Sequence, residues 1–232
     1  MNGYNAIAID GPSGAGKSTL ARMLAKAFGF LYVDTGAIYR TLGLACLRAG
    51  IDRRDAAAVM ELLPTLEIAI RYNDNGEQCM FLNGEDVSRE IRLPEISIAA
   101  SDVSAHQEVR SFLLEMQRKF ARESNVIMDG RDIGTVVLPE AELKIFLTAS
   151  AEARAARRYK ELLEKGQNVT YEEVLRDIVR RDEQDTNRAA APLKKADDAI
   201  VADTSGLNLE ESFALLCDIV ITRLAVEPEA AP

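Results

Sequence analysis

A chain of 232 residues, 47% of them hydrophobic, is long enough for one sizeable α/β domain or a core with a small insert, and two large independent domains are not expected. No run approaches the ~18 uninterrupted apolar residues of a membrane span, and no secretory leader is indicated, so we expect a soluble protein without a membrane partner. The net charge of −9 argues against a general nucleic-acid surface, because binding to the phosphate backbone depends on clustered Lys and Arg.

The cysteines and the single histidine exclude further kinds of site. Cys46, Cys79 and Cys217 lie far apart without CxxC spacing, which predicts neither a disulfide framework nor a zinc site and indicates a reducing, cytoplasmic location. Because His106 is the only histidine, the chain has no material for a histidine-based triad or a multi-histidine metal site.

The chain begins with a strand, a glycine-rich loop and a helix. Residues 6–10 read as a short buried strand, and residues 17–28 have helical spacing. A second strand over 30–33 and a helix over 38–47 follow.

The pattern then changes to short β-like runs between about residues 65 and 104. The segment NDNG at 73–76 and the pair Asn83 and Gly84 separate these runs. Because Asn followed by Gly supplies the two positive φ values of a tight hairpin turn, we expect a small β-meander that forms an insert.

Strands and helices alternate again in the rest of the chain. We expect helices over 106–122, 151–165, 171–188 and 207–224, and strands over 125–129, 143–148 and 199–203. This alternation predicts an α/β fold with a mostly parallel sheet covered on both faces, with ligand sites at the carboxyl ends of the strands. Those ends carry Asp10, Asp34, Asp129 and Asp203.

The first loop fits the pattern G-x-x-x-x-G-K-[ST], in which successive backbone N–H groups point inward at a phosphate. Lys17 is expected to contact the β and γ phosphates, and the Ser18 hydroxyl to ligate Mg²⁺. The alternative is a glycine-rich turn with an incidental lysine. The predicted nucleotide-binding residues are Gly11, Pro12, Ser13, Gly14, Ala15, Gly16, Lys17, Ser18 and Thr19.

A triphosphate site alone does not distinguish switches, motors and kinases. The chain has no Asn-Lys-x-Asp segment for reading guanine, and it is short for an ATP motor or a transporter subunit. Phosphotransfer to a small molecule therefore remains.

The segment MDGRDIGT leaves a strand with polar side chains. Asp129 at the strand end is suited to hold Mg²⁺ through water, and Arg131 to form two parallel hydrogen bonds with a phosphate or carboxylate. An Asp-Gly turn with an adjacent surface ion pair is the alternative.

Two groups of charged residues follow on predicted helices. Arg181, Asp185 and Arg188 share one face, either to clamp an anion or as ordinary surface charge pairs. The preceding helix carries Arg154, Arg157 and Arg158, either in a lid that closes over the transferring phosphoryl group or as solubilising surface charge.

Taken together, IAIDGPSGAGKST, DTGAIYR, DGRDIGT and RRDEQDTNRAAAPL resemble segments of the bacterial cytidylate kinases, which are nucleoside monophosphate kinases, in the same order. The resemblance covers nearly the whole chain and implies a P-loop three-layer fold. It divides the chain into a kinase core at 1–64 and 105–227 with a helical lid at about 150–190, a β-rich nucleoside monophosphate-binding insert at 65–104, and a flexible tail at 228–232.

The resemblance implies that ATP, with Mg²⁺, phosphorylates CMP or dCMP. Ser101, Arg110 and Asp132 would read the cytosine edge. Further acceptor residues would be Thr35, Arg40, Arg131, Arg181, Asp185 and Arg188; Thr35 stands where the family often has serine. Arg154 and Arg157 would bind ATP, Ser18 and Asp129 the metal, and the catalytic groups would be Lys17, Asp129, Arg131, Arg158 and Arg188.

Two other functions stay open on the residues alone. One is a kinase for another nucleoside monophosphate, or for a small hydroxyl metabolite with Asp34 or Asp129 as the base. The other is a non-enzymatic ATP-dependent switch. The arginine surplus favours a phosphate acceptor, whose anionic oxygen needs no general base. We expect a monomer whose partners are nucleotides.

Overall fold

The computed structural model describes residues 4–228, and within them the chain divides into two compact units. Unit 1 comprises the chain up to Leu31 and from Ala121 onward, and unit 2 comprises Tyr32–Phe120. Of the predicted tail, 228–232, all but Pro228 lies outside the described residues. No helix within 4–228 has the length and apolar character needed to cross a membrane.

A parallel sheet forms the centre of the fold, as the sequence predicted. Its order is β2-β6-β1-β7-β8. The strands span Leu31–Asp34 (β2), Val126–Gly130 (β6), Ala6–Asp10 (β1), Leu143–Thr148 (β7) and Ile200–Asp203 (β8). All of β1 is buried, because β6 and β7 pair with its two edges and helices flank the sheet.

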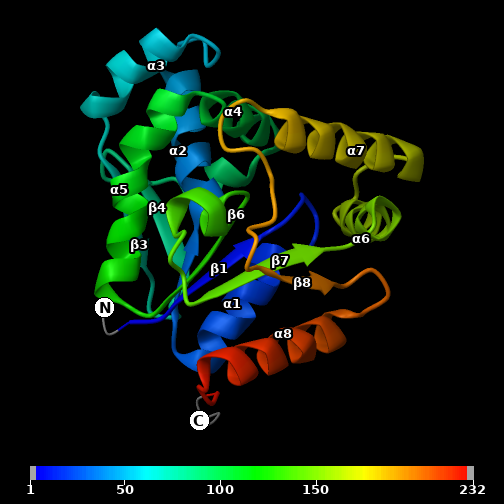
Figure 1. The fold of residues 1–232 in the computed structure, drawn as a ribbon. Coiled ribbons are helices and arrows are strands. Elements are labelled where there is room, and N and C mark those ends of the chain that lie inside the picture. The colour runs from blue at the N-terminus through cyan, green and yellow to red at the C-terminus, as the bar shows by residue number, and fades with distance from the viewer. Residues whose placement is uncertain (1–3, 229–232) are drawn as a thin grey trace. The chain divides into compact units, whose positions relative to one another are not determined.

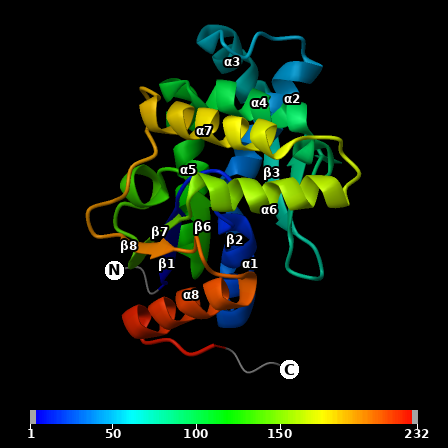
Figure 2. The ribbon, with the colours of Figure 1, turned by 90° about the vertical axis from the view of Figure 1, so that its right-hand side faces the viewer.

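The helices of unit 1 pack in pairs (Figures 1 and 2). Helices α1 (Lys17–Phe28) and α8 (Leu209–Leu224) pack together against the sheet. Helices α6 (Ala151–Glu164) and α7 (Tyr171–Asn187) form the second pair around a small apolar cluster that includes Ala155 and Ile178. A single π-helical turn, η3, covers Ile133–Val137. The four helices predicted in unit 1 are confirmed to within two residues at each end, whereas the helix predicted over 38–47 begins three residues earlier, at Thr35.

Unit 2 has its own apolar core around α2. Its elements are α2 (Thr35–Arg48), α3 (Ala56–Leu62), η1 (Leu63–Thr65), β3 (Ile68–Tyr72), β4 (Gln78–Leu82), β5 (Glu85–Asp86), η2 (Glu90–Arg92), α4 (Pro94–Ser104) and most of α5 (Gln107–Glu123). The core joins side chains of α2, α4 and α5 to strand β4. The expected β-meander is present as the antiparallel sheet β3-β4-β5.

Two details of the predicted meander are wrong. Asn83 and Gly84 both have positive φ, 50° and 82°, as a tight hairpin turn requires, but of Asn75 and Gly76 only Gly76 does. Here the Asn73 side chain accepts hydrogen bonds from the backbone N–H groups of Asn75 and Glu77, which gives a longer loop. The stretch of β-like sequence also ends before residue 104, because Pro94 starts helix α4.

Candidate active site

The loop between β1 and α1 requires glycine at specific positions. Gly11, Gly14 and Gly16 have φ values of 152°, 76° and 87°, which side chains on an L-residue disfavour. A Cβ on Gly11 would also lie 1.9 Å from the backbone oxygen of Leu147 on β7. The loop therefore passes close to the sheet and ends at the N-terminus of α1, where backbone N–H groups favour an anion.

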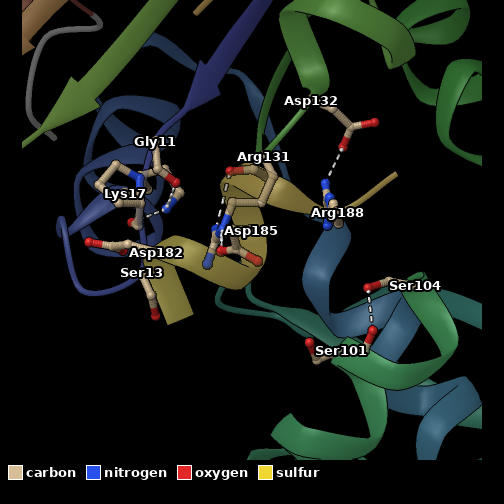
Figure 3. Close-up of polar contacts among 12 residues, drawn as sticks. Gly11, Ser13, Lys17, Ser101, Ser104, Arg131, Asp132, Asp182, Asp185 and Arg188 are labelled. Atoms are coloured by element: carbon tan, nitrogen blue, oxygen red, sulfur yellow. Dashed lines mark hydrogen bonds and ion pairs between the residues drawn. The ribbon is translucent and has the colours of Figure 1, made fainter. Parts of the chain in front are cut away.

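Lys17, in the first turn of α1, is buried within this loop (Figure 3). Its Nζ donates to the backbone oxygens of Gly11, at 2.8 Å, and Pro12, at 2.7 Å. Burial, and after it the positive charge of Arg131, lower the pKa of Lys17 to about 7, although nearby carboxylates oppose the shift. A phosphate group beside Lys17 would supply the negative charge that the buried ammonium favours.

Ser18 and Asp129 meet beside the loop, as the predicted Mg²⁺ site requires. The Ser18 hydroxyl donates to Oδ2 of Asp129, at the carboxyl end of β6, over 2.8 Å. Hydroxyl and carboxylate oxygens are the hard donors that Mg²⁺ prefers, with water and substrate phosphates completing its shell. Among residues 4–228 no group of three or more His, Cys, Asp or Glu side chains could hold a metal by itself. The donor set thus fits Mg²⁺ brought in with a nucleotide.

Asp10 fixes the backbone segment that follows β6. Its two carboxylate oxygens accept the N–H groups of Ile133, at 2.8 Å, and Gly134, at 2.7 Å. Burial raises the pKa of Asp10 to about 6, although these two hydrogen bonds oppose the shift. The contact holds in place the short segment that carries Arg131 and Asp132.

Arg131 and Arg188 each pair with a carboxylate in unit 1 (Figure 3). Arg131 Nε donates to Asp185 on α7 over 2.6 Å, and the guanidinium of Arg188, directly after α7, lies 3.7 Å from Asp132. Burial raises the pKa of Asp185, but the charges of Arg131, Arg188 and Arg181 outweigh burial and keep it below its usual value. Helix α7 therefore lies against the segment that follows β6.

The three arginines of α6 have different environments. Arg154 is buried and bonds to the loop residue Ser13 and to Asp182 on α7. Arg157 donates to the backbone oxygens of Thr204 and Leu207, after β8. Arg158 is exposed and pairs with Glu161 on the same helix. Of the three, Arg158 is the one with the most solvent-facing charge.

In unit 2, Asp34 holds two arginines at the start of α2. Arg40 Nη2 lies 2.8 Å and Arg92 Nη1 3.0 Å from Oδ2 of Asp34, which also caps the helix by accepting from the N–H of Ala37. Burial raises the pKa of Asp34, but Arg40 and Arg92 outweigh this and lower it overall. Arg40 keeps a buried Nε without a hydrogen bond, which an anion would satisfy. Thr35 is buried at the first position of the helix.

Ser101 and Arg110 lie on neighbouring helices of unit 2. Ser101 is exposed on α4, and its backbone oxygen accepts from the Ser104 hydroxyl over 3.1 Å (Figure 3). Arg110 on α5 is buried, donates to the Ser104 backbone oxygen over 3.3 Å, and lies 5.4 Å from the ring centroid of Tyr39. Hydrogen bonds thus link Ser101 and Arg110, two of the three predicted base-reading residues, to Ser104, whereas the third, Asp132, belongs to unit 1.

Sequence reasoning missed two partners of these residues, Asp182 and Arg92. Asp182 lies on α7, three residues before Asp185, and so on the same side of the helix. That spacing was a usable signal, whereas nothing in the sequence around Arg92 pairs it with Asp34.

A parallel sheet whose first strand leads through this loop into a helix, with Lys17 inside the loop and Ser18 joined to Asp129, defines the P-loop class of nucleotide-binding proteins. Comparison with known proteins is more specific. The cytidylate kinase family model matches residues 7–222. The chain therefore belongs to the cytidylate kinase family.

Individual relatives agree with this assignment. The cytidylate kinase of Carboxydothermus hydrogenoformans is 53% identical over 214 residues, covering 92% of this chain and 96% of that protein. The cytidylate kinase of Geobacter sp. strain M21 is 52% identical over 220 residues, covering 94% of both. A solved structure of an uncharacterised protein from Eubacterium ventriosum ATCC 27560 aligns with a TM-score of 0.50 at 12% identity, over 94% of this chain and 99% of that one, and bears on the fold alone.

Proposed function

We propose that this chain transfers the γ-phosphoryl group of ATP to the phosphate of CMP or dCMP, giving ADP and CDP or dCDP. The observation that carries the proposal is the buried Lys17 inside the glycine loop, beside the Ser18–Asp129 pair, in a member of the cytidylate kinase family. The acceptor oxygen is already an anionic nucleophile, so positioning and charge stabilisation account for most of the catalysis.

ATP and Mg²⁺ are the proposed cofactors. Backbone N–H groups of Gly11–Thr19 bind the phosphates, Lys17 contacts the β and γ phosphates, and Ser18 and Asp129 hold the metal. Mg²⁺ would neutralise charge on the phosphate oxygens as it develops. Arg158, exposed on α6 and paired with Glu161 of the same helix, is the proposed lid arginine for the transferring group.

The proposed acceptor residues come from the family resemblance. Ser101, Arg110 and Asp132 read the cytosine edge. The acceptor phosphate and sugar contact the other members of the predicted set, Thr35, Arg40, Arg131, Arg181, Asp185 and Arg188. Arg131 and Arg188 each face a carboxylate within unit 1, which supports a role for these guanidinium groups in binding an anion. The insert at 65–104 and the lid at about 150–190 remain proposals as functional divisions of the chain.

A hydroxyl acceptor is disfavoured by the state of the two candidate bases. Asp34 is paired with both Arg40 and Arg92, which hold its pKa below its usual value and make it a weak base. Asp129 accepts the Ser18 hydroxyl and is needed for the metal. A neutral hydroxyl would therefore find no suitable base at either position.

We further propose that the enzyme acts as a cytoplasmic monomer in pyrimidine nucleotide metabolism. The three widely spaced cysteines are consistent with a reducing cytoplasm. The net charge of −9 favours small nucleotides over nucleic acid as partners.

The test is ADP formation from ATP and Mg²⁺ with CMP, dCMP, UMP, AMP, GMP or dTMP as acceptor. Shikimate and gluconate serve as hydroxyl controls, and a reaction without acceptor measures simple ATP hydrolysis. We expect rapid turnover with CMP and dCMP. Rapid turnover with a hydroxyl acceptor would contradict the proposal, and ATP binding without turnover on any acceptor would favour a switch.

A further inference from the structure

Arg154 connects the phosphate loop to two other parts of unit 1. Its Nε donates to the backbone oxygen of Ala149 over 2.9 Å, and its Nη1 donates to the backbone oxygen of Ser13 over 2.9 Å. Nη1 and Nη2 also donate to the two carboxylate oxygens of Asp182 on α7, over 3.0 and 2.6 Å. Four of the five N–H groups of a guanidinium are thus engaged. Arg154 therefore has little capacity left for a phosphate.

The bond to Ser13 controls the direction of a loop N–H group. The Ser13 carbonyl and the Gly14 N–H belong to one planar trans peptide, in which they point in opposite directions. A carbonyl directed at Arg154 therefore directs the Gly14 N–H away from Arg154. In a phosphate-binding loop the carbonyls face outward and the N–H groups converge on the anion. The Arg154 stem also supports Gly14, since a Cβ there would lie 3.5 Å from Arg154 Cβ.

Asp182 holds the guanidinium in this position. Arg154 is only 4% exposed, and a buried cation needs a counter-ion in good geometry. The two parallel bonds from Arg154 to Asp182 provide it. Without Asp182, the charge of Arg154 would favour turning toward water and away from the Ser13 carbonyl.

We propose that Arg154 and Asp182 are a positioning pair that orients the phosphate loop for ATP, and that Arg154 is not itself a nucleotide ligand. This inference rests on the proposed ATP site. It gives Asp182 a role, and it replaces the direct contact with ATP that the family resemblance implied for Arg154.

The two roles of Arg154 give opposite expectations when Asp182 is neutralised. If Arg154 binds ATP directly, Asp182→Asn removes the carboxylate that competes with ATP for the guanidinium. The KM for ATP then stays unchanged or falls. If Arg154 positions the loop, Asp182→Asn loosens its anchor and raises that KM.

The experiment measures kcat, the KM values for ATP and CMP, and the equilibrium Kd for ATP in three variants. Asp182→Asn and Arg154→Lys remove the paired geometry. The matched control is Asp177→Asn, on the same helix, whose pair with Arg180 is exposed. We expect the KM and Kd for ATP to rise about 10-fold or more in both test variants, with the KM for CMP within about twofold and the control like the unmodified protein.

An unchanged or lower ATP KM in Asp182→Asn overturns the proposal, as does an equal rise in both KM values. Circular dichroism and thermal melting test whether each variant is folded. If Asp182→Asn does not fold, Asp182→Glu replaces it. We expect a smaller rise in the KM for ATP in Asp182→Glu, and an unchanged KM for ATP again overturns the proposal. Failure of the unmodified protein to phosphorylate CMP would instead contradict the proposed function.

Discussion

Lys17 illustrates how one residue is costly to the fold and necessary for the proposed chemistry. Its ammonium is buried among backbone carbonyls, and burial lowers its pKa to about 7. The folded protein therefore binds this proton less tightly than the unfolded chain does. Between about pH 7 and pH 10 this residue makes the free energy of unfolding rise with pH.

Lys17→Met should separate stability from activity. We expect kcat to fall about 10³-fold or more, because the charge near the transferring phosphoryl group is lost. The thermal midpoint at neutral pH should equal or exceed that of the unmodified protein, because a buried charge is replaced by an apolar side chain. Lys26→Met, exposed on the same helix, is the control and should change neither. A midpoint far below that of the control would contradict this interpretation of Lys17.

Asp10 gives a pH dependence of the opposite sign. Its pKa is about 6 in the folded protein, above its ordinary value of 3.8, so the folded state binds the proton more tightly. The contribution of Asp10 to stability is thus fully present below about pH 4 and is lost as the pH rises through about 6.

Asp10→Asn removes this titration. We expect the free energy of unfolding of the unmodified protein, minus that of the variant, to fall by about 1–3 kcal/mol between pH 4 and pH 7 and to be constant above pH 7. Urea unfolding at a series of pH values measures it. A difference that rises with pH would mean that the hydrogen bonds from Ile133 and Gly134 outweigh the burial of the carboxyl.

At the scale of elements, the end of β1 depends on the absence of a side chain. A Cβ on Gly11 would lie 1.9 Å from the Leu147 oxygen on β7, so Gly11→Ala must push β1 and β7 apart. We expect a loss of more than about 3 kcal/mol of stability, together with loss of ATP binding. Gly50→Ala is the control, because φ there is 68° but no atom lies within 4 Å of the added carbon. Its cost should be about 1 kcal/mol, for backbone strain alone. Equal costs in urea unfolding would refute the steric argument.

The sequence predicted elements well where one physical rule dominated. Buried parallel strands are continuous apolar runs, so β1, β6 and β7 were found within one residue at either end. Helix α4 was missed because its apolar residues follow a β-like stretch, and only Pro94 marks the change. The turn at residues 73–76 was misjudged because the Asn73 side chain, and not the Asn-Gly pair, determines its shape.

The site was predictable in its parts but not in its pairings. The glycine loop and the meeting of Ser18 with Asp129 follow from a local motif and from strand ends that share one edge of a sheet. The bond from Arg154 to Asp182 joins residues 28 positions apart on different helices. Helical periodicity gives the face on which a side chain lies but not its partner on another helix.

At the scale of the whole molecule, we predict that the active species is a single chain. The exposed large apolar side chains of the described residues, such as Ile98, Val201 and Leu209, come from separate elements. Light scattering after size exclusion should give the mass of one chain, and kcat should not depend on enzyme concentration. A dimer mass, or activity that falls on dilution, would contradict this prediction.

The chain order of the two units has a consequence for recombination. Unit 2 is one uninterrupted stretch, Tyr32–Phe120, with its own apolar core, whereas unit 1 is assembled from the segments on either side. Two crossovers, near residues 31 and 121, would therefore exchange unit 2 as one block between homologous genes while the host kept its own glycine loop, with the joints at the start of β2 and near the end of α5. Chimeras built at these joints would inherit Ser101 and Arg110 from the donor gene and Lys17 from the host.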